Sequence, residues 1–127
     1  MVILRLDHLV LTVASIPVSI DFYTRILGFE AVEANGRWAL KFGQQKINLH
    51  QADLTFDPKA AYPTSGSGDL CFITNDAPEQ TLTHLQSVGV VIEEGPVEHN
   101  GALGRMISLY FRDPDGNLLE VSKYLNL

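Results

Sequence analysis

The feature that most constrains the fold of this chain is an internal repeat. When His8 is aligned with Asp69, which lies 61 positions later, the flanking segments HLVLTV and DLCFIT fall into register. The same offset aligns Pro17 with Pro78, and it aligns the following LG and VG pairs. Self-similarity at a fixed offset is the signature of a duplicated supersecondary unit. The 127 residues are therefore predicted to form two similar modules.

Each half predicts a strand, a helix and then further short strands. The first helix has Ser15 as an N-cap and ends at Gly28, while the second has Asp76 as a possible cap and ends at Gly89. The further strands are expected at 30–33, 37–42 and 46–50 in the first half, and at 90–93, 105–111 and 117–123 in the second.

The expected fold class is α+β, with two tandem βαβββ modules that form a cupped, mostly antiparallel mixed sheet. We expect one domain over residues 1–127, because this length is ordinary for a single core. The first module covers about 1–52, a linker covers about 53–67, and the second module covers about 68–127.

Charge and cysteine content limit the classes of partner. Nine basic and fifteen acidic residues give a net charge of −6, which disfavours binding to nucleic acid or to an anionic membrane surface. The single cysteine, Cys71, excludes an internal disulfide and fits a reducing cytoplasm. The opening segment lacks the features of a signal peptide, and no apolar run is long enough to span a membrane. These observations predict a soluble cytoplasmic protein.

Alternation along the predicted strands separates an aliphatic face from a mixed face that carries most of the polar groups. The mixed face holds His8, Thr12, Asn48, His50, Asp69, Ser108, Tyr110 and Glu120. A concave sheet lined in this way is typical of a small-molecule site. Histidine and carboxylate side chains are also ligands for a divalent ion such as Zn, Ni, Mn, Co or Fe. The alternative is that each polar residue faces solvent at a strand end.

Two end motifs carry a family resemblance. The segment LDHLVLTVASIPVSIDFYTRILGFE and the closing FRDPDGNLLEV, with paired modules between them, resemble the vicinal oxygen chelate superfamily. That superfamily includes glyoxalase I, fosfomycin-resistance enzymes, extradiol dioxygenases and bleomycin-binding proteins. The resemblance covers nearly the whole chain, and it is strongest to small glyoxalase-domain proteins, some of them called virulence proteins. It implies a cup closed by two modules around one divalent metal ion.

The resemblance also implies a ligand set, with two positions intact and two altered. The ligand positions on the first and last strands match His8 and Glu120. The position that opens the second module, usually histidine, holds Asp69. The position on the fourth strand holds Asn48, with His50 one same-face step away. We therefore expect His8, Glu120, Asp69 and His50 as metal ligands, with Asn48 as an alternative to His50.

The activity implied by this resemblance is a metal-dependent lyase or isomerase of the glyoxalase I type. Glu120 is the expected base, and His50 is expected to replace a missing second acid. Expected contacts to a small oxygen-chelating substrate come from Asn48, Thr12, Ser108, Tyr110 and Arg105. Many relatives are homodimers, so we also expect a homodimer, and the cup is formed within one chain or shared by two.

Two other functions stay open. A cup of the bleomycin-resistance type would sequester a small molecule without a metal and without chemistry. An extradiol-type dioxygenase with Fe(II) is disfavoured, because its site resembles two histidines and a glutamate and Asp69 breaks that set.

Overall fold

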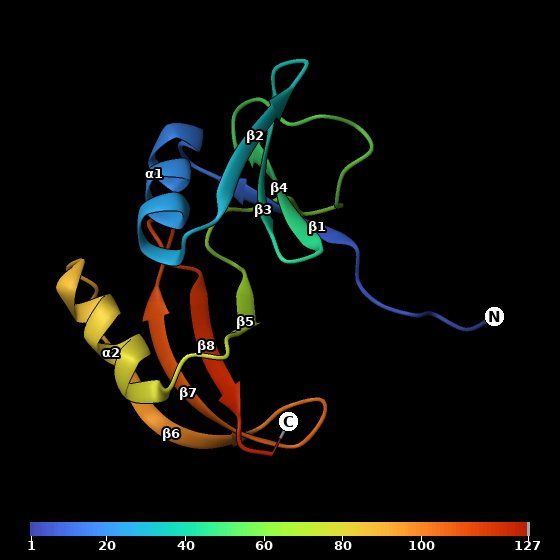
Figure 1. Cartoon of the computed structure of the whole chain (residues 1–127). Coiled ribbons are helices and arrows are strands. Elements are labelled where there is room, and N and C mark those ends of the chain that lie inside the picture. Colours follow the sequence, from blue (N-terminus) through green and yellow to red (C-terminus); the bar gives the residue numbers. More distant parts are fainter. Residues whose placement is uncertain (127) are drawn as a thin grey trace. The chain divides into compact units, whose positions relative to one another are not determined.

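The computed structural model describes residues 1–126, which fold into two compact units, Met1–Ser67 and a second that begins at Gly68 (Figure 1). The α+β class is confirmed, with one four-stranded mixed sheet and one helix in each unit. The elements of the first unit are β1 (His8–Val13), α1 (Ile16–Leu27), β2 (Glu30–Ala34), β3 (Arg37–Phe42) and β4 (Gln45–Gln51). Those of the second are β5 (Asp69–Ile73), α2 (Pro78–Ser87), β6 (Glu94–Asn100), β7 (Arg105–Arg112) and β8 (Leu118–Tyr124).

The two sheets share one topology, which confirms the predicted duplication. The strand order is β1-β4-β3-β2 in the first unit and β5-β8-β7-β6 in the second. In each, the first strand pairs in parallel with the last, and the remaining pairs are antiparallel. Each module is therefore a parallel crossover through a helix followed by an antiparallel meander.

In the first unit, α1 packs against the aliphatic face of its sheet. Tyr23 from the helix is fully buried with Val13, Leu40 and Ile47 from three strands. An aromatic ladder continues this core, because the Phe29 ring stacks on Tyr23 at 5.7 Å and on Phe42 at 4.4 Å between centroids. Burial of these rings and aliphatic side chains is the main term that holds helix and sheet together.

The second unit repeats this arrangement with a smaller helix contact. Leu85 of α2 is buried, and α2 contacts β7 and β8. Leu109, Phe111 and Leu119 supply the aliphatic face beneath it, each 1% exposed or less. The polar face of both sheets is therefore the face without a helix of its own unit.

The helix ends test two local predictions. Ser15 is the N-cap of α1, and its Oγ accepts the Val18 N–H at 3.3 Å, while Gly28 closes the helix in the left-handed region. The prediction that Asp76 caps α2 was wrong, because the N-cap is Ala77. The Ala77 N–H instead donates to the Gln80 side chain at 3.0 Å, so this end is satisfied from within the first turn.

The expected strand at 90–93 was also wrong, because β6 runs over Glu94–Asn100. Gly95 and Pro96 read as strand breakers, but here they form an irregularity between Glu94 and Val97 where the register to β7 shifts. Gly95 has φ 112°, and a Cβ at this position would collide with the Ser108 carbonyl oxygen. A glycine is therefore required for β6 to pass close to β7.

Among the described residues, neither helix is long and apolar enough to cross a membrane.

Candidate functional site

In the second unit, the polar face centres on Glu120 of β8, which is only 7% exposed. The Ser122 hydroxyl donates to Glu120 Oε2 at 3.1 Å. Because a carboxylate only accepts, this bond uses the Ser122 proton, and the Ser108 hydroxyl must then donate to Ser122 Oγ at 2.7 Å. Ser108 and Ser122 are both buried. This chain of hydroxyls holds the carboxylate in one orientation on the sheet.

Two further side chains on this face respond to the Glu120 charge. Tyr110 lies opposite Glu120 across β7 and β8, and loss of solvation together with hydrogen bonding to Glu120 raises the pKa of its phenol to about 12. Cys71 lies opposite Glu120 across β5 and β8. Partial desolvation raises the pKa of the Cys71 thiol, and the Glu120 and Asp69 charges add to this, although the hydrogen bond between Cys71 and Ser122 opposes it. Cys71 is therefore a thiol that resists ionisation and lines the face.

The turn before β8 fixes where Glu120 lies. Asp113 Oδ1 accepts the backbone N–H groups of Asp115 and Asn117, each at 2.9 Å. The Asn117 side chain donates to Asp113 Oδ2 at 2.8 Å, and its Oδ1 accepts the Gly68 N–H at 2.7 Å. The DPDGN motif is thus a turn, as expected, and it joins the start of β8 to the start of β5.

In the first unit, His8 begins β1 and its ring is held by its neighbour Asp7. His8 Nδ1 lies 2.9 Å from Asp7 Oδ2, and Arg5 in turn pairs with Asp7 at 3.5 Å. An ionised carboxylate only accepts, so Nδ1 carries a proton, and the neutral tautomer with this bond has its lone pair on Nε2. A carboxylate behind an imidazole is the arrangement that orients histidine ligands of metal ions.

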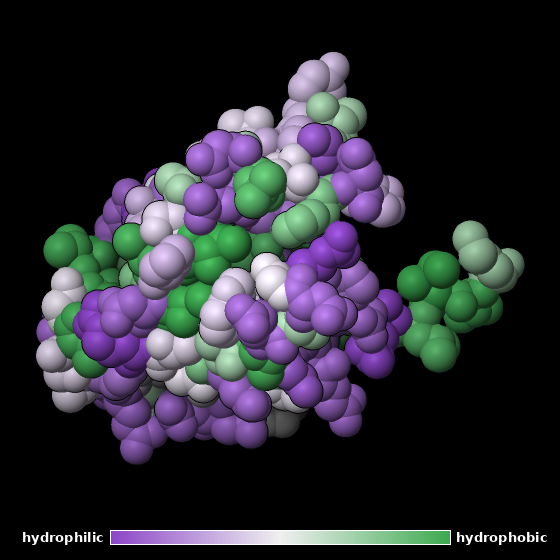
Figure 2. All heavy atoms as spheres, turned by 90° about the horizontal axis from the view of Figure 1, so that it is seen from above, coloured by the Kyte–Doolittle hydropathy of each residue, from purple (hydrophilic) through white to green (hydrophobic). Residues whose placement is uncertain are grey.

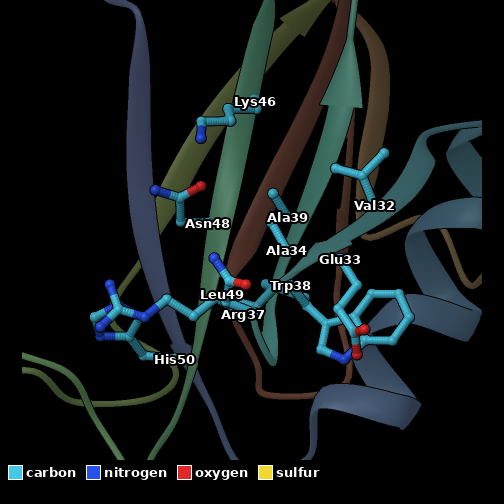
Figure 3. Close-up of a pocket in the computed structure, with 11 residues that line it drawn as sticks. Val32, Glu33, Ala34, Arg37, Trp38, Ala39, Lys46, Asn48, Leu49 and His50 are labelled. Atoms are coloured by element: carbon cyan, nitrogen blue, oxygen red, sulfur yellow. The ribbon is translucent and has the colours of Figure 1, made fainter.

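The polar face of the first sheet also contains a cavity of about 430 Å³ (Figure 3). Its lining includes Arg37, Lys46, Asn48 and His50, with Val32 and Ala39 between them. The Arg37 guanidinium lies over the Phe56 ring, 4.3 Å from its centroid, and His50 meets the same ring edge-on at 5.5 Å. Burial, followed by the Arg37 and Lys59 cations, lowers the pKa of His50. The imidazole in this cavity is therefore held neutral at pH 7.

The strand register separates His8 from His50. His8 is paired with Lys46 and Thr12 with His50, so four residue positions lie between the two imidazoles. At about 3.3 Å per residue this is about 13 Å, too far for both rings to bind one ion. Asn48 lies nearer, since it is paired with Val10, two positions from His8. The register thus places His8 nearer to Asn48 than to His50.

Asp69 lies at the exposed start of β5, opposite Leu118, and it shares the face of Glu120. Within residues 1–126, no three His, Cys, Asp or Glu side chains are grouped so that they alone could hold a metal ion. The donor types at His8, Asp69 and Glu120 nevertheless suit a divalent ion, because imidazole nitrogen and carboxylate oxygen are its usual protein ligands.

Three other residues predicted to contact substrate lie on β1 and β7. Thr12 is buried on the polar face beside His50. Tyr110 lines a hollow of about 390 Å³ together with Glu94 and Leu118. Arg105 is engaged at the edge of β7, where it pairs with Glu98 at 2.6 Å and donates to Asn100 at 3.1 Å.

Sequence reasoning missed two residues of these sites. Asp7 was signalled by its position directly before His8. Phe56 falls in the expected linker, and no local pattern indicates that it contacts Arg37 and His50.

Comparisons with known proteins agree with this architecture. The family model described as "Glyoxalase/Bleomycin resistance protein/Dioxygenase superfamily" matches residues 5–121. Virulence protein STM3117 of Salmonella typhimurium is 53% identical over 126 residues, which are 98% of this chain and 88% of that protein. Its crystal structure superposes with a TM-score of 0.97 and covers 98% of this chain and 100% of that chain.

Two further relatives extend the comparison. The glyoxalase domain-containing protein RDO1 of Mycosarcoma maydis is 52% identical over 120 residues, 94% of this chain and 68% of that protein. A lactoylglutathione lyase from Agrobacterium tumefaciens shares the fold with a TM-score of 0.73 at 24% identity, over 94% of this chain and 92% of that chain. The chain therefore belongs to the glyoxalase/bleomycin resistance protein/dioxygenase superfamily.

Proposed function

We propose that this protein is a divalent-metal-dependent lyase or isomerase of the glyoxalase type that acts on a small oxygen-chelating substrate. The observation that carries the proposal is Glu120, a buried carboxylate held by Ser122 on the polar face of the second sheet. Burial of a carboxylate is costly unless the charge has a function or a partner. The Glu120–Ser122–Ser108 chain orients this group for chemistry instead of neutralising it with a cation.

On the basis of their donor types, we propose His8 Nε2 in the first unit, and Glu120 and Asp69 in the second unit, as candidate ligands of a divalent ion. His50 is left out of this set, because the register places it about 13 Å from His8 along the strands. When bound, the ion would polarise the two substrate oxygens as a Lewis acid. Zn, Ni, Mn, Co and Fe all accept such donors, and Asp69 in place of a histidine shifts the preference towards harder ions.

Glu120 would act as the base in this reaction. Its carboxylate would take a proton from one substrate carbon and return it to the adjacent carbon, so that the reaction is a net isomerisation. The Ser122 hydroxyl bond to Oε2 would steady the carboxylate during both transfers. Tyr110, whose pKa of about 12 keeps the phenol protonated, would donate a hydrogen bond to substrate or to Glu120.

The test is isomerisation of the methylglyoxal–glutathione adduct by the purified full chain, with each divalent ion in turn and with chelator. The proposal predicts turnover that requires an ion and that falls by a factor of about a hundred or more in Glu120→Gln. Turnover in the presence of chelator would exclude the ion from the mechanism. Unchanged turnover in Glu120→Gln would exclude Glu120 as the base. If no ion supports turnover, glyoxalase-type isomerisation of this adduct is ruled out as the function of the protein.

A second candidate is a metal-free binding protein that sequesters a small molecule. One observation favours it, which is the cavity of about 430 Å³ in the first unit. The metal requirement separates the two candidates, because a binding-only protein needs no divalent ion.

We also propose that the protein is a cytoplasmic homodimer. The supporting observation is the apolar N-terminal segment Met1–Leu4, whose side chains are 75% exposed or more and project beyond β1 (Figures 1 and 2). A run of consecutive exposed apolar side chains is typical of an association surface. Sedimentation of the full chain should give a dimer, and removal of residues 1–4 should weaken it. A monomeric full chain would refute this proposal.

A further inference from the structure

The cavity on the first sheet concentrates positive charge in a protein that is otherwise acidic. The chain has a net charge of −6, yet Arg37 and Lys46 line this cavity and the Lys59 charge acts on His50 from the segment beside it. The one carboxylate in the lining is Glu33. In Figure 3 it lies beside Trp38, on the side of the cavity away from His50 and Arg37. The half of the cavity around Arg37 is therefore cationic.

Arg37 differs from the other four arginines. Arg5, Arg25, Arg105 and Arg112 each form an ion pair with an aspartate or glutamate. In the part of the chain that the structure describes, Arg37 has no such pair, and its guanidinium stacks on the Phe56 ring. An aromatic ring under a guanidinium fixes its plane and leaves its edge N–H groups free to bind an acceptor.

His50 faces the same point and has an unmet hydrogen-bonding need. His50 Nδ1 is buried and has no hydrogen-bond partner among the described residues. A buried polar atom without a partner costs stability, and such atoms in native structures usually have a functional reason. Arg37 precedes Trp38, which is paired with Leu49, and His50 follows Leu49, so the two side chains lie opposite each other on β3 and β4. Figure 3 shows them together at one end of the cavity.

The rest of the cavity suits a small organic body with a second polar group. Val32, Ala39 and Asn48 lie side by side across β2, β3 and β4, and they form an apolar floor that ends at an amide. Lys46 lies two residues before Asn48 on β4, and its side chain is on the same face of the sheet. A cavity of about 430 Å³ falls within the range of small-molecule sites.

We propose that this cavity binds a small organic carboxylate, with the carboxylate group on Arg37 and His50 and the apolar body over Val32 and Ala39. Asn48 and Lys46 then contact a second polar group of the ligand. This proposal rests on the proposed function, because it takes the polar face of the sheet as the face that binds substrate. It adds that the substrate is an organic acid anion. It identifies Arg37, and not the ion-paired Arg105, as the residue that recognises the negative charge.

The probe pair is benzoate and benzamide, which share a ring and a planar head group and differ in charge. Each is titrated into the ¹⁵N-labelled full chain in chelator, and amide shifts are followed by NMR. We expect benzoate to shift the amides around Arg37 on β3 and His50 on β4, with benzamide binding about tenfold or more weakly. Since no ion is present, this result is independent of the metal-dependent reaction.

Arg37→Gln should weaken benzoate binding by about tenfold or more. The matched control is Arg25→Gln, which removes the same charge from α1, where Arg25 pairs with Asp21, and it should bind benzoate as the wild type does. Lys46→Gln is a second test within the cavity, and dispersed NMR spectra establish that each variant is folded.

Equal binding of benzoate and benzamide, no benzoate shift on β3 and β4, or equal affinities of Arg37→Gln and Arg25→Gln would overturn the proposal. If benzoate binds but the protein shows no metal-dependent turnover, the carboxylate site is supported and the isomerase proposal is rejected.

Discussion

The Asn117 side-chain amide donates to the Asp113 carboxylate at 2.8 Å, and both side chains are at least 95% buried. Through Oδ1 the same amide accepts the Gly68 N–H, so one side chain joins the turn before β8 to the start of β5. Glu120 follows three residues after Asn117. The position of the proposed base therefore depends on this buried contact.

Asn117→Ala should lower the free energy of unfolding by about 2–4 kcal/mol, because it removes the buried amide that donates to Asp113 Oδ2 and that accepts the Gly68 N–H. Urea-induced unfolding measures the change. Asn75→Ala removes an exposed amide and serves as the control, with an expected effect within about 0.5 kcal/mol. Equal stability of the two variants would show that the Asn117 bonds contribute nothing.

Gly95→Ala should destabilise the protein by about 2 kcal/mol or more, because the added Cβ would collide with the backbone of Ser108 and Leu109. Gly43→Ala is a matched control, since Gly43 also has a positive φ but has open space around its Cβ position. That control should cost only the conformational strain of about 1 kcal/mol. Thermal or urea unfolding compares the two. A smaller effect at Gly95 than at Gly43 would contradict the close approach of β6 and β7.

His50 should titrate below its ordinary value of 6.5, because burial and the Arg37 and Lys59 cations disfavour the imidazolium. The unfolded chain then binds a proton more readily than the folded chain, so the contribution of His50 to stability is present at neutral pH and is lost as the pH falls below 6.5. NMR titration of the His50 ring measures the pKa directly. Arg37→Gln should raise it, whereas Arg25→Gln should leave it unchanged. A His50 pKa above 6.5 would be incompatible with this account.

Asp7→Asn should weaken divalent-metal binding by about 10–100-fold, because the Nδ1 proton of His8 loses its carboxylate acceptor. Asp21→Asn, which alters an exposed carboxylate on α1, is the control. Isothermal titration with a divalent ion gives both affinities. If Asp7→Asn binds the ion as tightly as Asp21→Asn, then Asp7 does not position His8.

Local signals predicted much of the fold. The repeat, the Ser15 and Gly28 helix ends and the alternation of the strands led to the observed modules, because each depends on neighbouring residues. The strand β6 was misplaced since Gly95 and Pro96 resemble a loop, and only pairing with β7 makes them part of a strand. The cap at Asp76 failed for a similar reason, because the Gln80 side chain satisfies the helix start instead.

The site was predicted less completely, because it depends on pairing between distant strands. That His8 and His50 share a face follows from alternation, but their separation follows from the parallel register of β1 and β4. Likewise, Phe56 contacts Arg37 and His50 from a segment without periodic signals. Residue types could be assigned from the sequence, whereas distances required the register.

Elemental analysis of the full chain after dialysis against each divalent ion tests the proposed metal site. We expect one bound ion per chain, with loss of that ion in His8→Ala and in Glu120→Gln. Glu79→Gln, which neutralises an exposed carboxylate on α2, should retain it. A wild-type chain that binds no ion, or a Glu120→Gln variant that binds as much as Glu79→Gln, would contradict the proposed metal site.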